Sequence, residues 1–237
     1  LSRADGLSRC PRRLRLDAIA TTGANSCGTH RNRYSAIRKE TIVFVKICGL
    51  TSSDAVHTAV EAGADAVGFV FADSPRRVSP KKAEKLCSDL PNHLIRVAVM
   101  HHPSADEWAA VREEFAPDWL QTDASDFQEL TLPIGCKAFP VYRNGLVPPP
   151  ITSGRILFEG VKSGKGKLAD WSEAATIATR TRLVLAGGLN TDNVEEAIRT
   201  VEPWGVDVST GVERQPGEKD SRRIASFIAH AKAAETL

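Results

Sequence analysis

The chain has 237 residues, of which 42% are hydrophobic and 25% charged, with a formal net charge of +2. This composition predicts a soluble protein with one sizeable core, and it excludes a membrane-spanning chain because no apolar stretch approaches the ~20 residues of a membrane helix. The five cysteines show neither a CxxC pair nor a histidine spacing suited to zinc, so we expect a reducing, cytoplasmic setting and neither metal nor cofactor.

Residues 1–41 differ in charge from the rest of the chain. They hold nine Lys/Arg against three Asp/Glu, a net charge of +6, so the remainder carries −4. The mildly acidic body argues against nucleic acid as a partner. The basic segment has four interpretations: an organellar transit peptide, a nucleic-acid-binding arm, the end of an upstream domain, or upstream sequence outside the natural protein. Because it lacks hydrophobic periodicity, we expect a disordered leader followed by one domain over 42–237.

Short apolar runs alternate with amphipathic segments from residue 42 onward. Cap signals support two of the helices: Ser79 precedes Pro80 at a helix start, and Ser104 and Glu107 have the spacing of a capping box. The predicted strands are 43–48, 66–71, 93–100, 119–121, 135–140, 155–159, 183–186 and 206–209. The predicted helices are 55–63, 80–90, 106–115, 170–180, 191–200 and 219–234.

Eight strands with mainly helical crossovers predict a (β/α)8 TIM barrel, an α/β fold. The fifth helix is expected to be degenerate, because three consecutive prolines within 146–153 cannot continue a helix. An open doubly wound sheet is the alternative. It is disfavoured because no GxGxxG turn follows the first strand.

Cys48 ends the first predicted strand, where barrel enzymes build their active sites. A cysteine there can act as a base or nucleophile, although an unpaired cysteine is also often a small buried hydrophobe. We expect the neighbouring Lys46 to point to the opposite face of the strand.

The last two predicted strand–helix loops carry small residues whose backbone N–H groups can approach an anion. Gly187 and Gly188 follow the seventh strand, and Ser209, Thr210 and Gly211 follow the eighth. Loops seven and eight commonly form a phosphate site in this fold. The alternative is that both are merely tight turns.

Four motifs occur in one order along the chain: KICGLT, GFVF with SPRRVSP, LAGGL, and GVDVSTGVE with PGEKD. Together they resemble the phosphoribosylanthranilate isomerase family, from about Val45 to the C-terminal helix. The resemblance implies a metal-free and cofactor-free barrel of tryptophan biosynthesis. It also implies an Amadori rearrangement of N-(5′-phosphoribosyl)anthranilate to the 1-deoxyribulose 5-phosphate derivative.

The same resemblance implies roles for individual residues. Cys48 corresponds to the general base, and Glu159 stands where the family usually has an aspartate as general acid. Arg76 corresponds to the arginine that meets the anthranilate carboxylate, while Gln121 and Asp207 are expected to bind substrate. The alternatives are a solvated loop charge for Arg76 and a structural hydrogen bond for Asp207.

Three departures from the family pattern leave other functions open, and the first is Glu159 in place of the usual aspartate. The family's QLHG after strand four is replaced here by residues 121–124, QTDA, and the loop over 160–167 is short with three lysines. The alternatives are a related aminoaldose-phosphate isomerase of the histidine pathway, which Cys48 disfavours, and a catalytically silent barrel that binds phosphorylated ligands. We expect a small phosphorylated substrate, no membrane, and a monomer or homodimer, with fusion to or association with other tryptophan-pathway enzymes left open.

Overall fold

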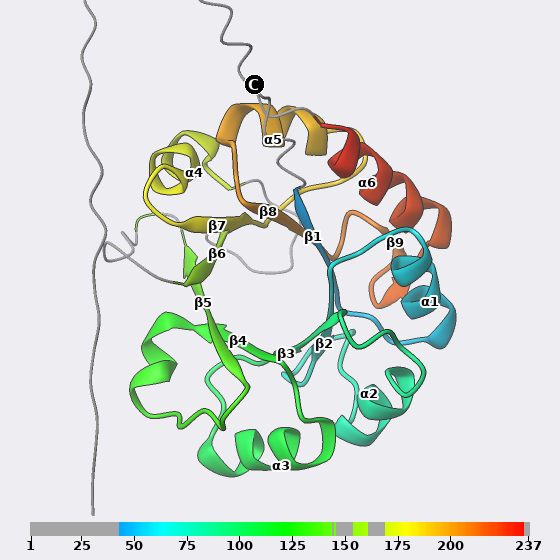
Figure 1. Ribbon diagram of the computed structural model, residues 1–237, viewed down its shortest axis with the longest axis vertical. Coiled ribbons are helices and arrows are strands. Elements are labelled where there is room, and N and C mark those ends of the chain that lie inside the picture. The colour runs from blue at the N-terminus through cyan, green and yellow to red at the C-terminus, as the bar shows by residue number, and fades with distance from the viewer. Residues whose placement is uncertain (1–42, 144, 146–153, 161–168, 235–237) are drawn as a thin grey trace, which may run out of the picture. The chain divides into compact units, whose positions relative to one another are not determined.

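The computed structural model describes residues 43–143, 145, 154–160 and 169–234. Eight parallel strands close into a barrel, each bonded to the next and β8 returning to β1. The strands are β1 (Phe44–Cys48), β2 (Ala66–Val70), β3 (Ile95–Val99), β4 (Trp119–Asp123), β5 (Lys137–Arg143), β6 (Arg155–Glu159), β7 (Arg182–Leu185) and β8 (Gly205–Val208). Figure 1 looks down the barrel and shows the helices outside the ring of strands. The predicted TIM barrel is confirmed, and the open sheet is excluded.

The helices begin where the sequence places their caps. The Ser79 side chain accepts from Lys82 N with Pro80 at the first turn, and the capping box of Ser104 and Glu107 is formed in both directions. The helices are α1 (Ser53–Glu61), α2 (Pro80–Leu86), α3 (Ala105–Phe115), α4 (Trp171–Ala178), α5 (Val194–Val201) and α6 (Ser221–Ala233), and a short 3-10 helix, η1 (Ala124–Gln128), follows β4.

Each helix departs from its predicted bounds by one to four residues at one end or both. Helix α2 stops at Leu86 rather than continuing to residue 90, and α6 begins at Ser221 rather than at Lys219. The side chain of Asp220 accepts from the backbone N–H groups of residues 222 and 223, so the helix can start only after it. Lys219 belongs instead to β10 (Glu218–Lys219), which forms an antiparallel hairpin with β9 (Glu213–Gln215).

Three predicted features fall outside the described residues. These are the leader over 1–41, the degenerate fifth helix over 146–153, and most of the lysine loop over 160–167. In the part of the chain that the structure does describe, no helix is long and apolar enough to cross a membrane.

Strand alternation divides the core into two layers. Along β1, Val45 and Ile47 pack outward against the helices, while Phe44 belongs to the cluster inside the barrel. Phe44 stacks on Trp204 with ring centroids 4.5 Å apart, and the Arg155 guanidinium lies 3.9 Å from the ring centroid of Trp119. These residues begin or precede their strands, so an aromatic layer fills the N-terminal end of the barrel. The polar interior residues lie toward the opposite end.

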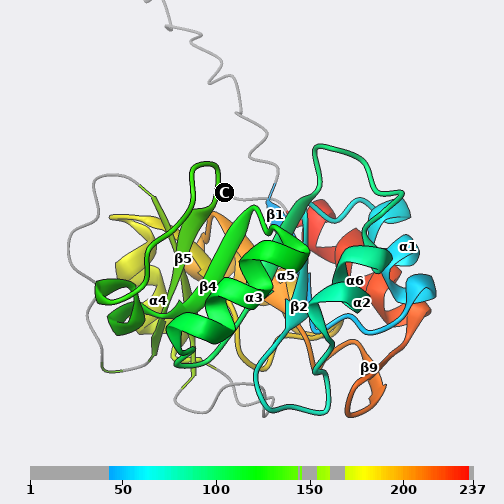
Figure 2. The same ribbon diagram turned by 90° about the horizontal axis from the view of Figure 1, so that it is seen from below.

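That opposite end carries the loops that follow the strands. Seen from the side in Figure 2, the β9 hairpin projects from the same end of the barrel as the loop between β2 and α2. The functional residues predicted from the motifs belong to this end, because each is at or after the last residues of its strand.

Candidate active site

Cys48 is the last residue of β1 and is 6% exposed. The expectation that Lys46 faces away from it is wrong. Side chains alternate along a strand with a period of two, so residues 46 and 48 point to the same, inner face. In β1, Lys46 is completely buried, and its Nζ lies 2.7 Å from Asp207 Oδ1 on the neighbouring β8.

Gly68 of β2 makes room for this arrangement. It is paired with Cys48, and a Cβ added to it would lie 3.1 Å from Lys46 Nζ and 3.2 Å from Cys48 Sγ. Both distances are tighter than ordinary van der Waals contact. A glycine inside a strand thus marks a close approach here, since the lysine and the thiol occupy the space that a side chain would need.

Opposing influences act on the Cys48 thiol. Burial raises the pKa of Cys48 above its ordinary value, because a thiolate loses its hydration inside the barrel. The positive charge of Lys46 counteracts that rise in pKa, Asp207 adds to it, and Lys219 counteracts it. The pKa of Lys46 itself is raised: burial works against its charge, but Asp207 and Cys48 outweigh burial.

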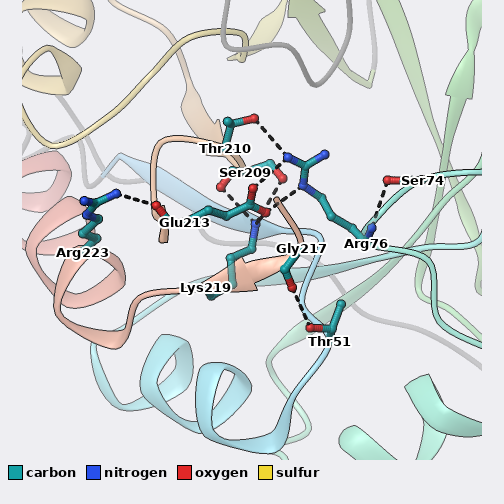
Figure 3. Close-up of polar contacts among 9 residues, drawn as sticks. All are labelled: Thr51, Ser74, Arg76, Ser209, Thr210, Glu213, Gly217, Lys219 and Arg223. Carbon is teal, nitrogen blue, oxygen red and sulfur yellow. Dashed lines mark hydrogen bonds and ion pairs between the residues drawn. The ribbon is translucent and has the colours of Figure 1, made fainter. Parts of the chain in front are cut away.

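Arg76 reaches the site from the loop after β2 by crossing the end of β1. Gly49 has a φ of +75°, and a Cβ there would lie 2.6 Å from Arg76 Cδ, so only glycine leaves this path open. The guanidinium binds Glu213 side-on, with Nε 2.7 Å from Oε1 and Nη2 2.8 Å from Oε2. Nη2 also lies 3.3 Å from Thr210 Oγ1 (Figure 3).

Glu213 joins Arg76 to the β9–β10 hairpin. Lys219 Nζ lies 2.8 Å from Glu213 Oε1 and also donates to the backbone oxygen of Ser209, at 3.0 Å, and to its Oγ, at 3.2 Å (Figure 3). Thr51 Oγ1 donates to Gly217 O in the hairpin turn, at 3.1 Å. The hairpin therefore ties together the loops that follow β1, β2 and β8.

The charges of this group are well defined. Burial acts to raise the pKa of Glu213, but hydrogen bonds from Arg76 and Lys219 outweigh it, so the pKa lies below the ordinary value of 4.5. Burial lowers the pKa of Lys219, and Glu213 works against that effect. Glu213 is therefore a carboxylate held between two cations.

The two predicted phosphate loops lie backbone against backbone. Gly187 and Gly188 have φ values of 87° and 71°, a conformation that glycine adopts without strain. Asn190 and Gly211 form an isolated parallel bridge, and a Cβ on Gly211 would lie only 2.0 Å from Leu189 O. A cavity is lined by both loops and also by Glu159 and Asp207. Its lining residues are Glu159, Ala186, Gly187, Gly188, Leu189, Asp207, Val208, Ser209, Thr210 and Gly211.

Glu159, the last residue of β6, belongs to a second polar network. Arg143 at the end of β5 lies between two carboxylates, with Nη2 3.1 Å from Glu159 Oε1 and Nη1 2.5 Å from Asp123 Oδ1. His102 continues the network with Nδ1 2.8 Å from Asp126 Oδ1 and Nε2 3.3 Å from Asp123 Oδ2. The hydrogen bond with Asp126 raises the pKa of His102.

This network occupies the region where the sequence departs from QLHG. The histidine lost at position 123 is replaced by an aspartate, and an imidazole from the loop after β3, His102, reaches the same place. Together with His101, these two residues bring three possible metal-ligand atoms within 4.8 Å of one another. Both imidazoles are exposed, and His102 already faces two carboxylates. Ion pairs between His102 and these carboxylates explain the contacts without a metal ion.

Gln121 lies inside the barrel on β4 and is 7% exposed. Its Oε1 is buried and has no hydrogen-bond partner among the described residues. A buried acceptor without a donor is costly. A ligand that brings an N–H or O–H group to this point would remove that cost.

Four residues of the site were not predicted: Lys46 as an interior residue, Arg143, Glu213 and Lys219. The signal for Lys46 was its charge within an apolar strand, two positions before Cys48. Glu213 and Lys219 lie within the motifs GVDVSTGVE and PGEKD, but their pairing carries no spacing signal, because Glu213 and its partner Arg76 are separated by 137 residues. Arg143 lies in none of the four motifs.

Known proteins resemble the chain over nearly all of the described part. The sequence profile "N-(5'phosphoribosyl)anthranilate (PRA) isomerase" matches residues 45–230. A protein of Listeria welshimeri named N-(5'-phosphoribosyl)anthranilate isomerase is 38% identical over 204 residues, which is 81% of this chain and 100% of the relative. The protein of the same name from Oceanobacillus iheyensis is 36% identical over 205 residues, covering 82% and 100%.

Solved structures agree with these sequence matches. The phosphoribosyl anthranilate isomerase of Thermus thermophilus has a TM-score of 0.69 at 26% identity, covering 79% of this chain and 98% of the other. Another phosphoribosyl anthranilate isomerase was solved with reduced 1-(o-carboxyphenylamino)-1-deoxyribulose 5-phosphate. It has a TM-score of 0.66 at 32% identity, covering 80% and 98%.

Proposed function

Because the chain belongs to the N-(5'-phosphoribosyl)anthranilate isomerase family, we propose a mechanism in which its own residues carry out this aldose–ketose isomerisation. The protein is an isomerase of tryptophan biosynthesis. It converts N-(5'-phosphoribosyl)anthranilate to 1-(2-carboxyphenylamino)-1-deoxyribulose 5-phosphate. One observation supports the roles proposed for individual residues. A thiol, Cys48, and a carboxyl group, Glu159, are each the last residue of a strand at the same end of the barrel, and both occupy inward-facing positions.

Glu159 is proposed as the general acid. It donates a proton to the ribose ring oxygen, the bond from that oxygen to C1′ breaks, and the nitrogen lone pair forms the C1′=N bond of the Schiff base. Cys48, as thiolate, then removes the C2′ proton, the electron pair of that C–H bond forms C1′=C2′, and the π electrons of the C1′=N bond return to nitrogen as its lone pair. The resulting enolamine becomes the ketone by moving a proton from the C2′ hydroxyl to C1′.

Arg76 is proposed to hold the anthranilate carboxylate while remaining bound to Glu213. The side-on pair uses Nε and Nη2, and among the described residues Nη1 donates to no acceptor. The end-on edge formed by Nη1 and Nη2 can therefore grip a second carboxylate, displacing only the long Thr210 contact. Glu213 fixes the direction of that edge.

The remaining contacts are assigned by their chemistry. The N–H groups around Gly187 and Gly188, with Ser209, Thr210 and Gly211, are proposed to bind the substrate phosphate. Gln121 is proposed to accept a hydrogen bond from substrate, because its buried Oε1 has no donor among the described residues. Asp207, which holds Lys46, borders the same cavity as the phosphate loops and is proposed to contact the ribose.

The ion pair between Arg143 and Glu159 affects the proposed role of Glu159 as a proton donor. A guanidinium beside a carboxylate favours its ionised form, whereas a general acid must carry a proton. We therefore propose that substrate binding loosens this ion pair, with Asp123 retaining Arg143 while Glu159 takes up the proton that it donates.

Growth complementation of a tryptophan auxotroph that lacks this isomerase tests the function in cells. The purified chain should convert the substrate in a fluorescence assay of the anthranilate group. Cys48→Ser and Glu159→Gln should each fail in both assays, while Cys136→Ser, at a half-buried position outside the site, should succeed in both. Full activity of either site variant would overturn its assigned role.

Two further expectations concern assembly and location. A dimeric phosphoribosylanthranilate isomerase is known from Thermotoga maritima, and we propose a monomer or homodimer here, to be decided by light scattering of the purified chain. We also propose a cytoplasmic location and association with other tryptophan-pathway enzymes. Fluorescent tagging of the chain with and without residues 1–41 would test whether that segment directs it to an organelle.

A further inference from the structure

The interior of the site contains an odd number of charges. Lys46 and Asp207 form one pair, and Arg76 and Glu213 form a second pair with two parallel hydrogen bonds. Lys219 is a third cation, whose ammonium group shares Glu213 with Arg76. All five residues are buried, with exposures between 0% and 8%. With every group ionised, the cluster carries a net charge of +1.

A buried uncompensated charge is unfavourable unless a counter-charge is near. Lys219 donates to three oxygens, but two of these belong to the neutral Ser209 and the third to the already paired Glu213. Ser209 in turn lies against the end of β1, because a Cβ on Gly49 would be 3.1 Å from Ser209 Oγ. Cys48 immediately precedes Gly49 in the chain and ends β1.

We propose that Lys219 is a positioning residue whose buried, uncompensated charge supports the thiolate form of Cys48. The thiolate brings the net charge of the cluster to zero. The inference rests on the proposed role of Cys48 as base and adds what makes that base available. Lys219 does not contact the reacting atoms in this scheme, since it acts through the charge of the thiol.

The electrostatic influences on both partners support the proposal. Lys219 acts to lower the pKa of Cys48, and Cys48 acts to raise the pKa of Lys219. The other charged groups coupled to the thiol are Lys46 on its own strand, Asp207 on β8 and Arg76 from the loop after β2. Lys46 and Asp207 are bound to each other, and Arg76 is held by Glu213 with two hydrogen bonds. Lys219 has no carboxylate of its own, because its partner Glu213 also binds Arg76. Its positive charge is therefore not cancelled by a separate anion.

The experiment measures ionisation of the thiol without substrate. Thiolate ultraviolet absorbance is followed against pH in the full chain, with the same chain carrying Cys48→Ser subtracted at each pH. Lys219→Met should raise the apparent pKa of Cys48 by about one to three units, because one opposite charge at short range shifts a pKa by that amount. Lys219→Arg should restore most of the original titration.

Two further variants complete the test. Glu213→Gln removes a negative charge from the same cluster and should shift the titration of Cys48 in the opposite direction, to lower pH. Lys232→Met is the matched control, because this lysine also forms an ion pair, with Asp65, but outside the site. It should leave the thiol titration unchanged. Should Lys219→Met not fold, as judged by melting, Lys219→Gln takes its place, because it also removes the charge while keeping a hydrogen-bond donor for Ser209; an unchanged thiol titration in Lys219→Gln would overturn the proposal.

Activity separates this proposal from a structural role. If Lys219 supports the thiolate, the acid limb of the kcat/KM profile of Lys219→Met moves to higher pH, and raising the pH restores turnover. If Lys219 only anchors the Ser209 loop, kcat/KM falls equally at every pH and the thiol titration stays in place, which would overturn the proposal. A shifted titration together with a fully active Cys48→Ser protein would instead retain the influence of Lys219 and refute the proposed base.

Discussion

Gly211→Ala should separate the two loops proposed to bind phosphate. An ordinary Cβ contact begins at 3.4 Å, whereas a Cβ at this position would lie 2.0 Å from Leu189 O, so the loops must part by about 1.4 Å. The obstructing atom belongs to backbone, and no side-chain rotation can relieve the clash. A misplacement near 1 Å can cost on the order of 100-fold in rate. We expect a loss of about that size in kcat/KM.

Two assays follow the change. Substrate conversion gives kcat and KM, and the midpoint of thermal unfolding with and without inorganic phosphate reports binding at the site. A ligand at 100 times its Kd stabilises the folded state by about 2.7 kcal/mol, so phosphate should raise the midpoint of the parent chain. The rise should disappear in Gly211→Ala.

Gly63→Ala is the control. Gly63 has a φ of +93° and an open space around the position of a Cβ, so alanine adds backbone strain of roughly 1–2 kcal/mol without a clash. It should lower the melting midpoint and preserve the rise with phosphate. If Gly211→Ala kept both that rise and a kcat/KM within about twofold of the parent, the assignment of these loops to phosphate would be wrong. Gly187→Ala, in the other loop, provides an independent test should Gly211→Ala fail to fold.

The remaining predictions concern the base, the acid, the buried carboxylate and the leader. Cys48→Ser should lose about 100-fold to 10,000-fold in kcat while still binding product, measured by turnover and calorimetry, and near-normal turnover would end its assignment as base. Glu159→Gln should nearly abolish turnover, and Glu159→Asp should be about 10-fold slower because the site is built for the longer side chain; an aspartate variant that equals the parent would show the length to be unimportant. The depressed pKa of Glu213 contributes stability that is present above its unfolded value near 4.5 and is lost as the pH falls through the lower folded value, so melting midpoints should decline less steeply with acid in Glu213→Gln than in the parent. Deleting residues 1–41 should leave the melting midpoint and turnover nearly unchanged, and a loss of several degrees would show that the segment packs on the barrel.

The barrel could be predicted because each strand and helix is indicated by a pattern within its own short segment of sequence. Apolar runs, the Ser79 and Ser104 caps, and small residues after the last strands are all properties of short segments. The exception inside a strand, Lys46, was predicted to face the wrong way because it was treated as an alternate position of the strand, whereas residues two apart, such as Lys46 and Cys48, share a face.

Pairings between distant segments were beyond the reach of such signals. Glu213 meets Arg76 only because the barrel closes and brings β8 beside β1, whose other neighbour is β2. Lys219 was expected to open a helix, and only the cap formed by Asp220 shows why it is left in a hairpin facing Ser209. Arg143 similarly becomes interpretable only when β4, β5 and β6 lie side by side.

The β9–β10 hairpin has a consequence for how substitutions combine. It braces the loops around the base through Arg76, Glu213 and Lys219, whereas Arg143 braces the loops around the acid. The two sets meet at the cavity that Glu159 lines together with Asp207 and Ser209. Free-energy effects of substitutions within one set are expected to couple. Double-mutant cycles between the two sets would measure how strongly this shared cavity links the base to the acid.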